Sequence, residues 1–179
     1  MRFWLVVIAF SLAHSTSAQQ RHELSLFGSH SDAGYHAAYG YGAAFSESWT
    51  PRISTAIAVG VDEATVCVGG SFLGLPCTQI KLRTRPIDLS ASHHFLNETR
   101  WKPYVGLGVR YLPAPHLTAE ERTAVGHAYS DHVSPEVVGG VELIVVPSFG
   151  ITVEGKQLVG HREPYDSFFK LSAALNWRF

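Results

Sequence analysis

The stretch FKLSAALNWRF (Phe169–Phe179) at the C-terminal end alternates between two kinds of side chain. One face is apolar and the other is small or polar: Phe169, Leu171, Ala173, Leu175, Trp177 and Phe179 alternate with Lys170, Ser172, Ala174, Asn176 and Arg178. Period two is the repeat of a β-strand whose faces meet different surroundings. The stretch therefore predicts a strand that has one apolar face and ends on an aromatic residue.

The same alternation recurs in seven earlier segments, whereas helical periodicity is nearly absent. These expected strands are His22–Ser29, Tyr35–Ser48, Ile53–Val61, Ile87–Phe95, Tyr104–Tyr111, Val137–Val145 and Ile151–Lys156. Together with the C-terminal segment they make eight, an even number that lets an antiparallel sheet close without a free edge.

The connections between the expected strands alternate in length. Tight turns are expected at Trp49–Pro51, Asn97–Trp101 and Pro147–Ser148. The first connection at the other end, near Ser29–Gly34, is also short; the longer ones there run from Asp62 to about Arg85, Pro113 to about His132 and Val159 to about Pro164. Short turns at one end and long loops at the other are typical of membrane barrels. We predict an all-β, eight-stranded, antiparallel up-and-down barrel over residues 19–179.

Residues 1–18 have the features of a cleaved secretion signal. Arg2 precedes the ten-residue apolar run Phe3–Leu12, and small residues lead to Ala18. A run of ten is too short for a spanning helix, which needs about 20 residues. An exported chain without such a helix is either soluble or a membrane barrel. The net charge of −1 gives no indication of nucleic-acid binding.

Alternation leaves open which face is outside. A soluble barrel would enclose a ligand with its apolar face, whereas a membrane barrel turns that face to lipid. Aromatic residues gather near the expected strand ends, as in interfacial girdles: Phe45, Trp49, Phe95, Trp101, Phe149, Trp177 and Phe179 at the turn end, and Tyr35, Tyr39, Tyr111 and Tyr165 at the loop end. The polar face mixes small residues with isolated charges, which suits a narrow filled interior. Both features favour the membrane.

One segment departs from the pattern. Ile80, Leu82 and Thr84 are in phase with one another but out of phase with Ile87 and Leu89. Pro is tolerated at a bulge or strand start. Either Pro86 marks a bulge, or the residues before it form a loop.

Three segments carry a resemblance to a known family. WKPYVGLGVRY (Trp101–Tyr111), GGVELIVVPSFGITVEGK (Gly139–Lys156) and LSAALNWRF (Leu171–Phe179) resemble the small outer-membrane barrels, namely the OmpA-type β-barrel domain and its OmpX-like relatives. The resemblance implies an integral outer-membrane location among lipids that include lipopolysaccharide. It also implies that Phe179 is the signal read by the barrel-assembly machinery. Members of this group act as anchors or adhesins or have no known role.

The charged residues of the polar face form the first candidate site. Seven are expected to point into the lumen: Asp88, Arg110, Glu142, Glu154, Lys156, Lys170 and Arg178. An eight-stranded barrel is just wide enough for side chains to fill, and unpaired buried charges are costly. We expect Glu142 and Glu154 to pair with Arg110 or Lys156. The network is interpreted as a salt-bridged plug, with a narrow gated ion path as the alternative.

A second candidate is His132 with Ser134, which superficially resembles the site of outer-membrane lipid A deacylases, where a His activates a Ser. Glu136 is the nearest acid that could orient the His. All three share the inner face, whereas lipid A approaches from outside, so an esterase is only an alternative.

The histidines and cysteines complete the candidates. The ten histidines show no tight ligand spacing, and we expect no metal or cofactor. Cys67 and Cys77 are expected to form a loop disulfide. The bridge would either present the apolar residues Phe72, Leu73 and Leu75 to a surface ligand or only stiffen the loop. The favoured function is a non-enzymatic barrel that supports the envelope or interacts through its loops.

Overall fold

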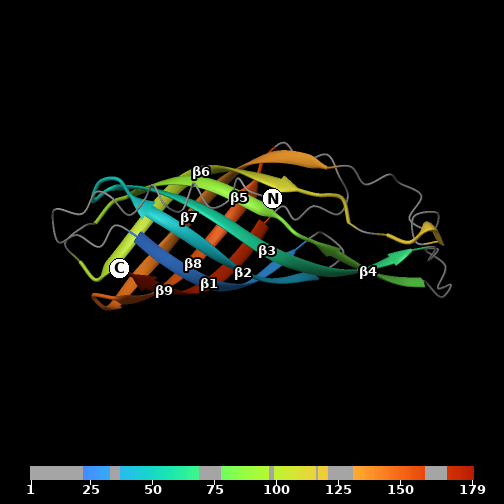
Figure 1. The fold of residues 1–179 in the computed structure, drawn as a ribbon, viewed down its shortest axis with the longest axis horizontal. Helices are drawn as coiled ribbons and strands as arrows, with labels where there is room; N and C mark the ends of the chain where they lie inside the picture. Colours follow the sequence, from blue (N-terminus) through green and yellow to red (C-terminus); the bar gives the residue numbers. More distant parts are fainter. Residues whose placement is uncertain are drawn as a thin grey trace, which may run out of the picture.

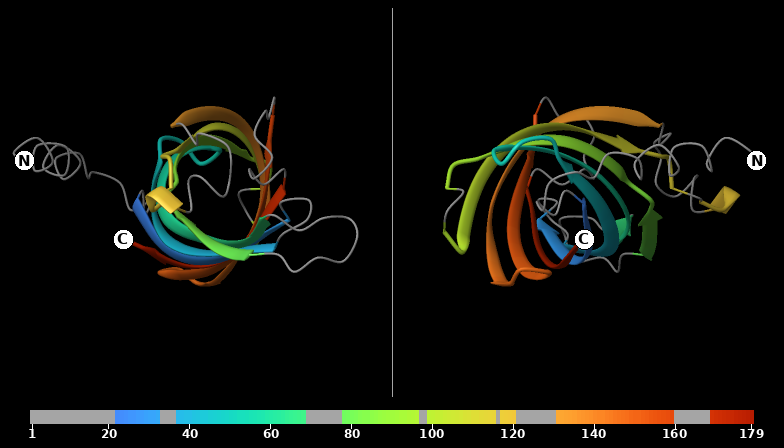
Figure 2. Two further views of the ribbon diagram at one scale, coloured as in Figure 1. Left: turned by 90° about the vertical axis from the view of Figure 1, so that its right-hand side faces the viewer. Right: turned by 60° about the vertical axis from the view of Figure 1, so that its left-hand side comes forward.

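The protein is a closed antiparallel barrel with a hairpin that projects from one end (Figures 1 and 2). The computed structural model describes residues 22–32, 37–68, 78–96, 99–115, 117–120, 131–159 and 169–179. Its strands are β1 (His22–Asp32), β2 (Ala37–Ser48), β3 (Ile53–Val68), β4 (Thr78–Thr84), β5 (Ile87–His94), β6 (Trp101–Leu112), β7 (His132–Val146), β8 (Phe149–Leu158) and β9 (Phe169–Arg178). The expected signal peptide lies outside the described residues.

Eight of these strands form the ring. The ninth, β4, pairs with the part of β3 that extends beyond its pairing with β5. Around the ring, neighbouring strands pair antiparallel in the order β1, β2, β3, β5, β6, β7, β8 and β9, and β1 pairs with β9 to close the sheet. At the seam, the backbone N–H of Phe179 donates to the carbonyl of His22 at 3.0 Å, and the N–H of His22 donates back at 3.3 Å. The predicted eight-stranded antiparallel barrel is confirmed.

The segment from Asp62 to Arg85 corrects one prediction. It is not simply a loop, because β3 continues to Val68 and pairs with β4. The register is the same on both sides of Pro86: Val59 faces Ile87 and Asp62 faces Thr84. The N–H of Gly60 donates to the carbonyl of Pro86 at 3.2 Å. Pro86 therefore interrupts the strand, which has neither a bulge nor a loop at this point.

The apolar residues before and after Pro86 are out of phase because the two segments have different surroundings. Ile80 and Leu82 are buried on the inner face of the hairpin, whereas Ile87 and Leu89 are exposed on the barrel exterior. Lys81 and Arg83 are exposed on the outer face of the hairpin. The outer surface thus changes from apolar on the barrel to charged on the hairpin.

The barrel is inside-out compared with a water-soluble domain. Among the described residues, only six hydrophobic side chains are buried but ten polar or charged ones are. Large apolar side chains are exposed on strands all round the ring, including Leu26, Tyr41, Ile57, Leu89, Leu107, Val137, Val153 and Leu171. Trp49, Trp101 and Phe179 are exposed at the turn end. Nowhere in the described part of the chain is there a helix with the length and apolarity to cross a membrane.

The strands are strongly staggered. Following the register from Arg110 on β6 once around the ring leads to Arg100, which directly precedes β6 and is ten residues from the start. The path is Arg110, Asp88, Ala58, Ala44, Ser25, Asn176, Gly150, Ile144 and Arg100. A stagger of this kind tilts the strands relative to the barrel axis. Inner residues that are far apart in register can therefore lie at the same height.

Candidate functional site: a luminal charge network

Buried polar side chains fill the lumen in two clusters. The loop-side cluster lies toward the ends of the strands that carry the longer connections and consists of Asp62, Asp88, Arg110, Glu136, Glu154, Lys156 and Lys170. The turn-side cluster lies toward the tight turns and consists of Glu23, Glu142, Asn176 and Arg178.

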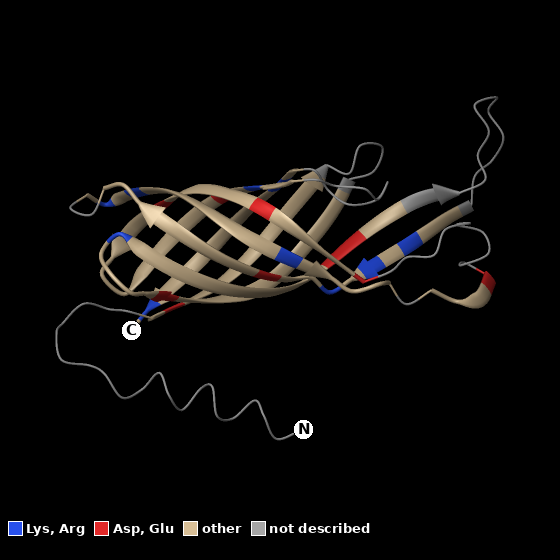
Figure 3. Ribbon diagram, turned by 90° about the horizontal axis from the view of Figure 1, so that it is seen from above, with Lys and Arg blue, Asp and Glu red and all other residues tan. Residues whose placement is uncertain are grey.

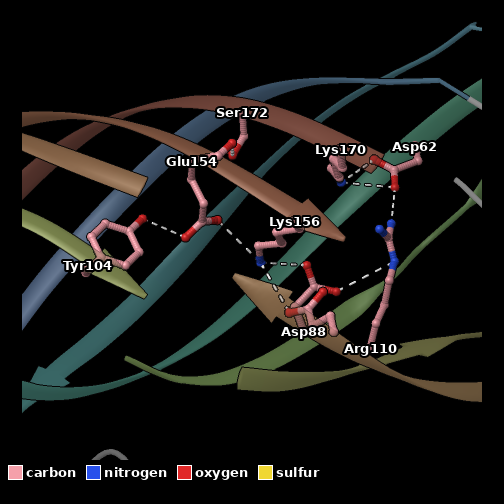
Figure 4. A network of polar contacts seen from close by, with 9 residues as sticks. Asp62, Asp88, Tyr104, Arg110, Glu154, Lys156, Lys170 and Ser172 are labelled. Atoms are coloured by element: carbon pink, nitrogen blue, oxygen red, sulfur yellow. Dashed lines mark hydrogen bonds and ion pairs between the residues drawn. The ribbon is translucent and has the colours of Figure 1, made fainter. Parts of the chain in front are cut away.

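Lys156 is the centre of the loop-side cluster (Figure 4). Its Nζ lies 3.0 Å from Asp88 Oδ2, 3.5 Å from Glu154 Oε1 and 3.7 Å from Glu136 Oε1. The side chain of Glu136 is fully buried. One ammonium thus compensates three carboxylates from three different strands, which is how buried charge becomes tolerable.

Asp62 is the second junction of the loop-side cluster. Lys170 Nζ lies 2.9 Å from its Oδ1, and Arg110 Nη2 donates to its Oδ2. Arg110 Nε also lies 3.7 Å from Asp88 Oδ1, which connects this junction to Lys156. The contacts run without a break from Lys170 on β9 across the lumen to Asp62 on β3, and return through β6 and β5 to Lys156 on β8 (Figure 4).

Tyr104 extends the network toward the turns. Its hydroxyl donates to Glu154 Oε2 at 2.7 Å. The ring lies over Gly140, where a Cβ would stand 2.7 Å from Tyr104 Cζ and 2.7 Å from the carbonyl oxygen of Val153. Gly140 therefore leaves the room that the ring needs.

The turn-side cluster shows that the predicted pairing of Glu142 with Arg110 or Lys156 was wrong. Glu142 contacts neither Arg110 nor Lys156; it accepts hydrogen bonds from Arg178 Nη2 and from Asn176 Nδ2, the latter at 3.1 Å. Arg178 Nε also lies 3.0 Å from Glu23 Oε2. The stagger is the cause, because Glu142 faces Lys102 in the β6–β7 register while Arg110 faces Ser134 eight residues further along β6.

Glu154 does lie beside Lys156, two residues away on the same face of β8. Asp88 and Arg110 face each other directly across β5 and β6. All seven predicted luminal charges thus lie in one of the two clusters, with Arg178 and Glu142 on the turn side.

Sequence reasoning missed several members. The sequence predicts Asp62 at the start of a loop and places Glu23 in the expected strand His22–Ser29 without a partner. Tyr104 begins the expected strand Tyr104–Tyr111 and Asn176 lies on the polar face of the C-terminal strand, but the sequence predicts no partner for either. Extending the alternation of Ile53–Val61 by one residue would have placed Asp62 inside.

A cavity of about 480 Å³ occupies the turn-side half of the lumen. Its lining begins at Thr50 and Pro147 by the turns and ends at Asp88, Lys156 and Lys170. Asp62, Arg110 and Glu136 are not part of that lining. The loop-side cluster therefore closes the inner end of the cavity.

The other candidates carry less chemistry. Ser134 and Glu136 are buried in the lumen, where a lipid outside the barrel does not contact them. Only His132 at the strand end is partly exposed. The described residues contain no group of three or more His, Cys, Asp or Glu side chains placed to hold a metal ion. Cys67 lies on β3, but Cys77 and the apolar loop tip lie outside the described residues, and so does the expected Cys67–Cys77 bridge.

The architecture matches solved membrane proteins. OprG from Pseudomonas aeruginosa superposes with a TM-score of 0.60 at 13% identity, covering 90% of this chain and 97% of that one. The fold is that of the small outer-membrane β-barrels. OmpW from E. coli gives a TM-score of 0.56 at 14% identity, with 91% and 100% coverage. Neisserial surface protein A gives 0.51 at 16%, with 88% and 96%. At these identities the similarity concerns the fold. No family model and no curated protein matches the sequence.

Proposed function

We propose that the protein is an integral outer-membrane barrel that does not conduct ions and that presents the β3–β4 hairpin and the longer loops at the cell surface. The observation that carries this proposal is the inverted distribution of polarity. Apolar side chains cover the exterior of the ring, while charged side chains fill its centre. Only hydrocarbon around the ring makes that arrangement favourable, because exposed apolar area is costly in water.

The closed lumen supports the absence of a wide pore. The loop-side cluster joins strands on opposite sides of the ring, and its paired side chains are almost completely buried. An ion would have to break several of these contacts to pass.

The cavity in the turn-side half of the lumen favours a second candidate function. In this case the barrel is a narrow channel that opens when the loop-side cluster rearranges. Planar-bilayer recordings distinguish the two functions. The wild-type barrel is expected to give no conductance steps, and steps in its recordings would contradict the proposal. Replacing both Arg110 and Lys156 by Ser is expected to produce steps if these side chains are what blocks the lumen. Silence in that variant would count against the channel.

The surface role is tested on cells. Protease added outside is expected to cut within residues 69–77 and to leave the barrel intact. Deleting residues 69–76 is expected to reduce attachment to host or abiotic surfaces without changing the heat-modifiable gel migration of the folded barrel. Unchanged attachment would leave support of the envelope as the role.

We also propose that Phe179 is part of the signal for the barrel-assembly machinery. Its aromatic side chain is exposed beside the β1–β9 seam. Phe179→Ala is expected to lower the amount of folded barrel in cells while leaving refolding of the purified chain unchanged.

A further inference from the structure

The outer face of the β3–β4 hairpin carries a row of cations. Lys81 and Arg83 on β4 and Arg85 just after it occupy alternate positions, and all three are exposed. Side chains two residues apart in a strand lie on the same face. Ile80 and Leu82, which alternate with Lys81 and Arg83, are buried on the inner face, and this fixes the orientation of the row.

The row is held in place but is not neutralised. Arg83 Nε lies 3.4 Å from Glu63 Oε1, and Arg83 Nη2 donates to the hydroxyl of Tyr41 at 3.5 Å. Within the described part of the chain, Lys81 and Arg85 have no hydrogen-bond or ion-pair partner. Three cations and one carboxylate leave a local excess of two positive charges.

The height of the row can be worked out from the register. Ile87 is the last exposed apolar residue before Arg85, two positions away on the same face. Two residues advance about 7 Å along a strand, and a tilt of about 40° reduces this to about 5 Å along the barrel axis. Arg85 and Arg83 thus stand about 5 and about 10 Å beyond the apolar surface. The headgroup region adds about 5–8 Å on each side of the hydrocarbon. Arg85 therefore lies within it, and Arg83 lies just beyond its outer edge, from where a long side chain can reach back toward it.

Among the described residues, the exposed positive charge at this end lies on one side of the barrel. On the described exterior at the loop end, the row supplies all the Lys and Arg residues, because Arg110, Lys156 and Lys170 point into the lumen. Figure 3 shows blue segments on the projecting hairpin. A charge so placed faces the lipid beside the hairpin.

We propose that the cationic row binds the phosphate group of a lipid headgroup in the outer leaflet of the membrane. Guanidinium groups bind phosphate oxygens through two parallel hydrogen bonds. Arg85 stands at the level of such oxygens, and the side chain of Arg83 starts just outside that level. The Tyr41 hydroxyl and the Glu63 carboxylate hold the guanidinium group of Arg83 in place. This inference rests on the proposed function, because the barrel must span the membrane with the hairpin outside.

The test uses the full-length barrel in phosphatidylcholine nanodiscs that contain a small fraction of spin-labelled, diphosphorylated lipid A. The immobilised fraction of the label measures binding. Each cation near a lipid surface contributes about fivefold in affinity, so Arg83→Gln/Arg85→Gln is expected to weaken binding about 30-fold. The matched control Arg52→Gln/Arg100→Gln removes two exposed arginines at the turn end and is expected to change binding less than threefold.

Three further arms make the test decisive. Lipid A without phosphates is expected to show no preference for the barrel, and millimolar inorganic phosphate is expected not to displace the bound lipid. Arg83→Lys/Arg85→Lys keeps the charges and should retain most of the binding. Equal loss in the control pair, or equal binding of the dephosphorylated lipid, would overturn the proposal and leave the row as a charged edge that prevents strand pairing. A barrel that fails to insert, shown by unmodified gel migration, would instead contradict the proposed function.

Discussion

Lys156 offers the sharpest test of the luminal network. Replacing it with Met removes the ammonium but keeps an unbranched side chain of similar length. In the structure that ammonium lies within 4 Å of carboxylate oxygens of Asp88, Glu136 and Glu154. The substitution therefore removes the cation that compensates three buried acids and leaves the packing almost unchanged.

The expected cost follows from the balance of charge. The loop-side cluster holds four carboxylates and three cations, so its formal charge changes from −1 to −2 when Lys156 is lost. Removing one partner of a buried ion pair typically costs about 3–5 kcal/mol, because the other charge stays buried without compensation. At about 1.4 kcal/mol per decade, the folded-to-unfolded ratio should fall by about 10²- to 10⁴-fold.

The assay is reversible urea unfolding in lipid vesicles, followed by tryptophan fluorescence. Lys102→Met is the matched control, since Lys102 faces the same lumen but has no ion pair within 4 Å among the described residues. The control should lose less than about 1.5 kcal/mol. Lys156→Met/Asp88→Asn should recover part of the loss because it restores the formal charge. A loss below about 1 kcal/mol for Lys156→Met would show that this network does not hold the lumen together.

Three other outcomes can be measured on the same barrel. Leu107 is 69% exposed near the middle of β6 and Val133 is 64% exposed near the loop end, so Leu107→Arg should cost about 2–4 kcal/mol in vesicle unfolding and Val133→Arg about 0–1; equal costs would contradict the lipid-facing exterior. Gly140→Ala should cost about 1–3 kcal/mol because its methyl meets a tyrosine ring and a carbonyl, whereas Gly28→Ala, with open space around the new Cβ, should change the unfolding free energy little. Asp131 accepts two hydrogen bonds that lower its pKa, first from a backbone N–H and then from a tyrosine hydroxyl; its contribution should persist above pH 3.8 and disappear as the pH falls through the lowered pKa, and a carboxyl NMR titration with a midpoint at or above 3.8 would contradict this.

The strands and their polarity could be predicted because both depend on neighbours in sequence. Alternation in the segment from Leu171 to Trp177 reports that the two faces of one strand meet different surroundings. The short turn at Pro147 is recognised because the alternation is interrupted between the expected strands Val137–Val145 and Ile151–Lys156. The segment Asp62–Arg85 could not be assigned in the same way, because the apolar side chains change faces where the outer surface changes from apolar to charged.

The pairing of luminal charges could not be predicted for a different reason. Sequence phase places Glu142 and Arg110 on the same inner face, but it does not say which residues of two strands stand opposite each other. That depends on the stagger of the closed ring, which brings Glu142 to Arg178 across the lumen.

The amino-acid sequence by itself determined the eight strands of the ring, the tight turns at Trp49–Pro51 and Pro147–Ser148 and which residues of a strand share a face, since a period of two needs no partner to be recognised. Tertiary structure alone decided the continuation of β3 into the projecting hairpin, the two separate clusters of charge and the closure of the lumen by the loop-side one. The physical reason is that closing a tilted sheet fixes contacts between residues more than a hundred positions apart, such as Asp62 and Lys170, and no local pattern records that geometry.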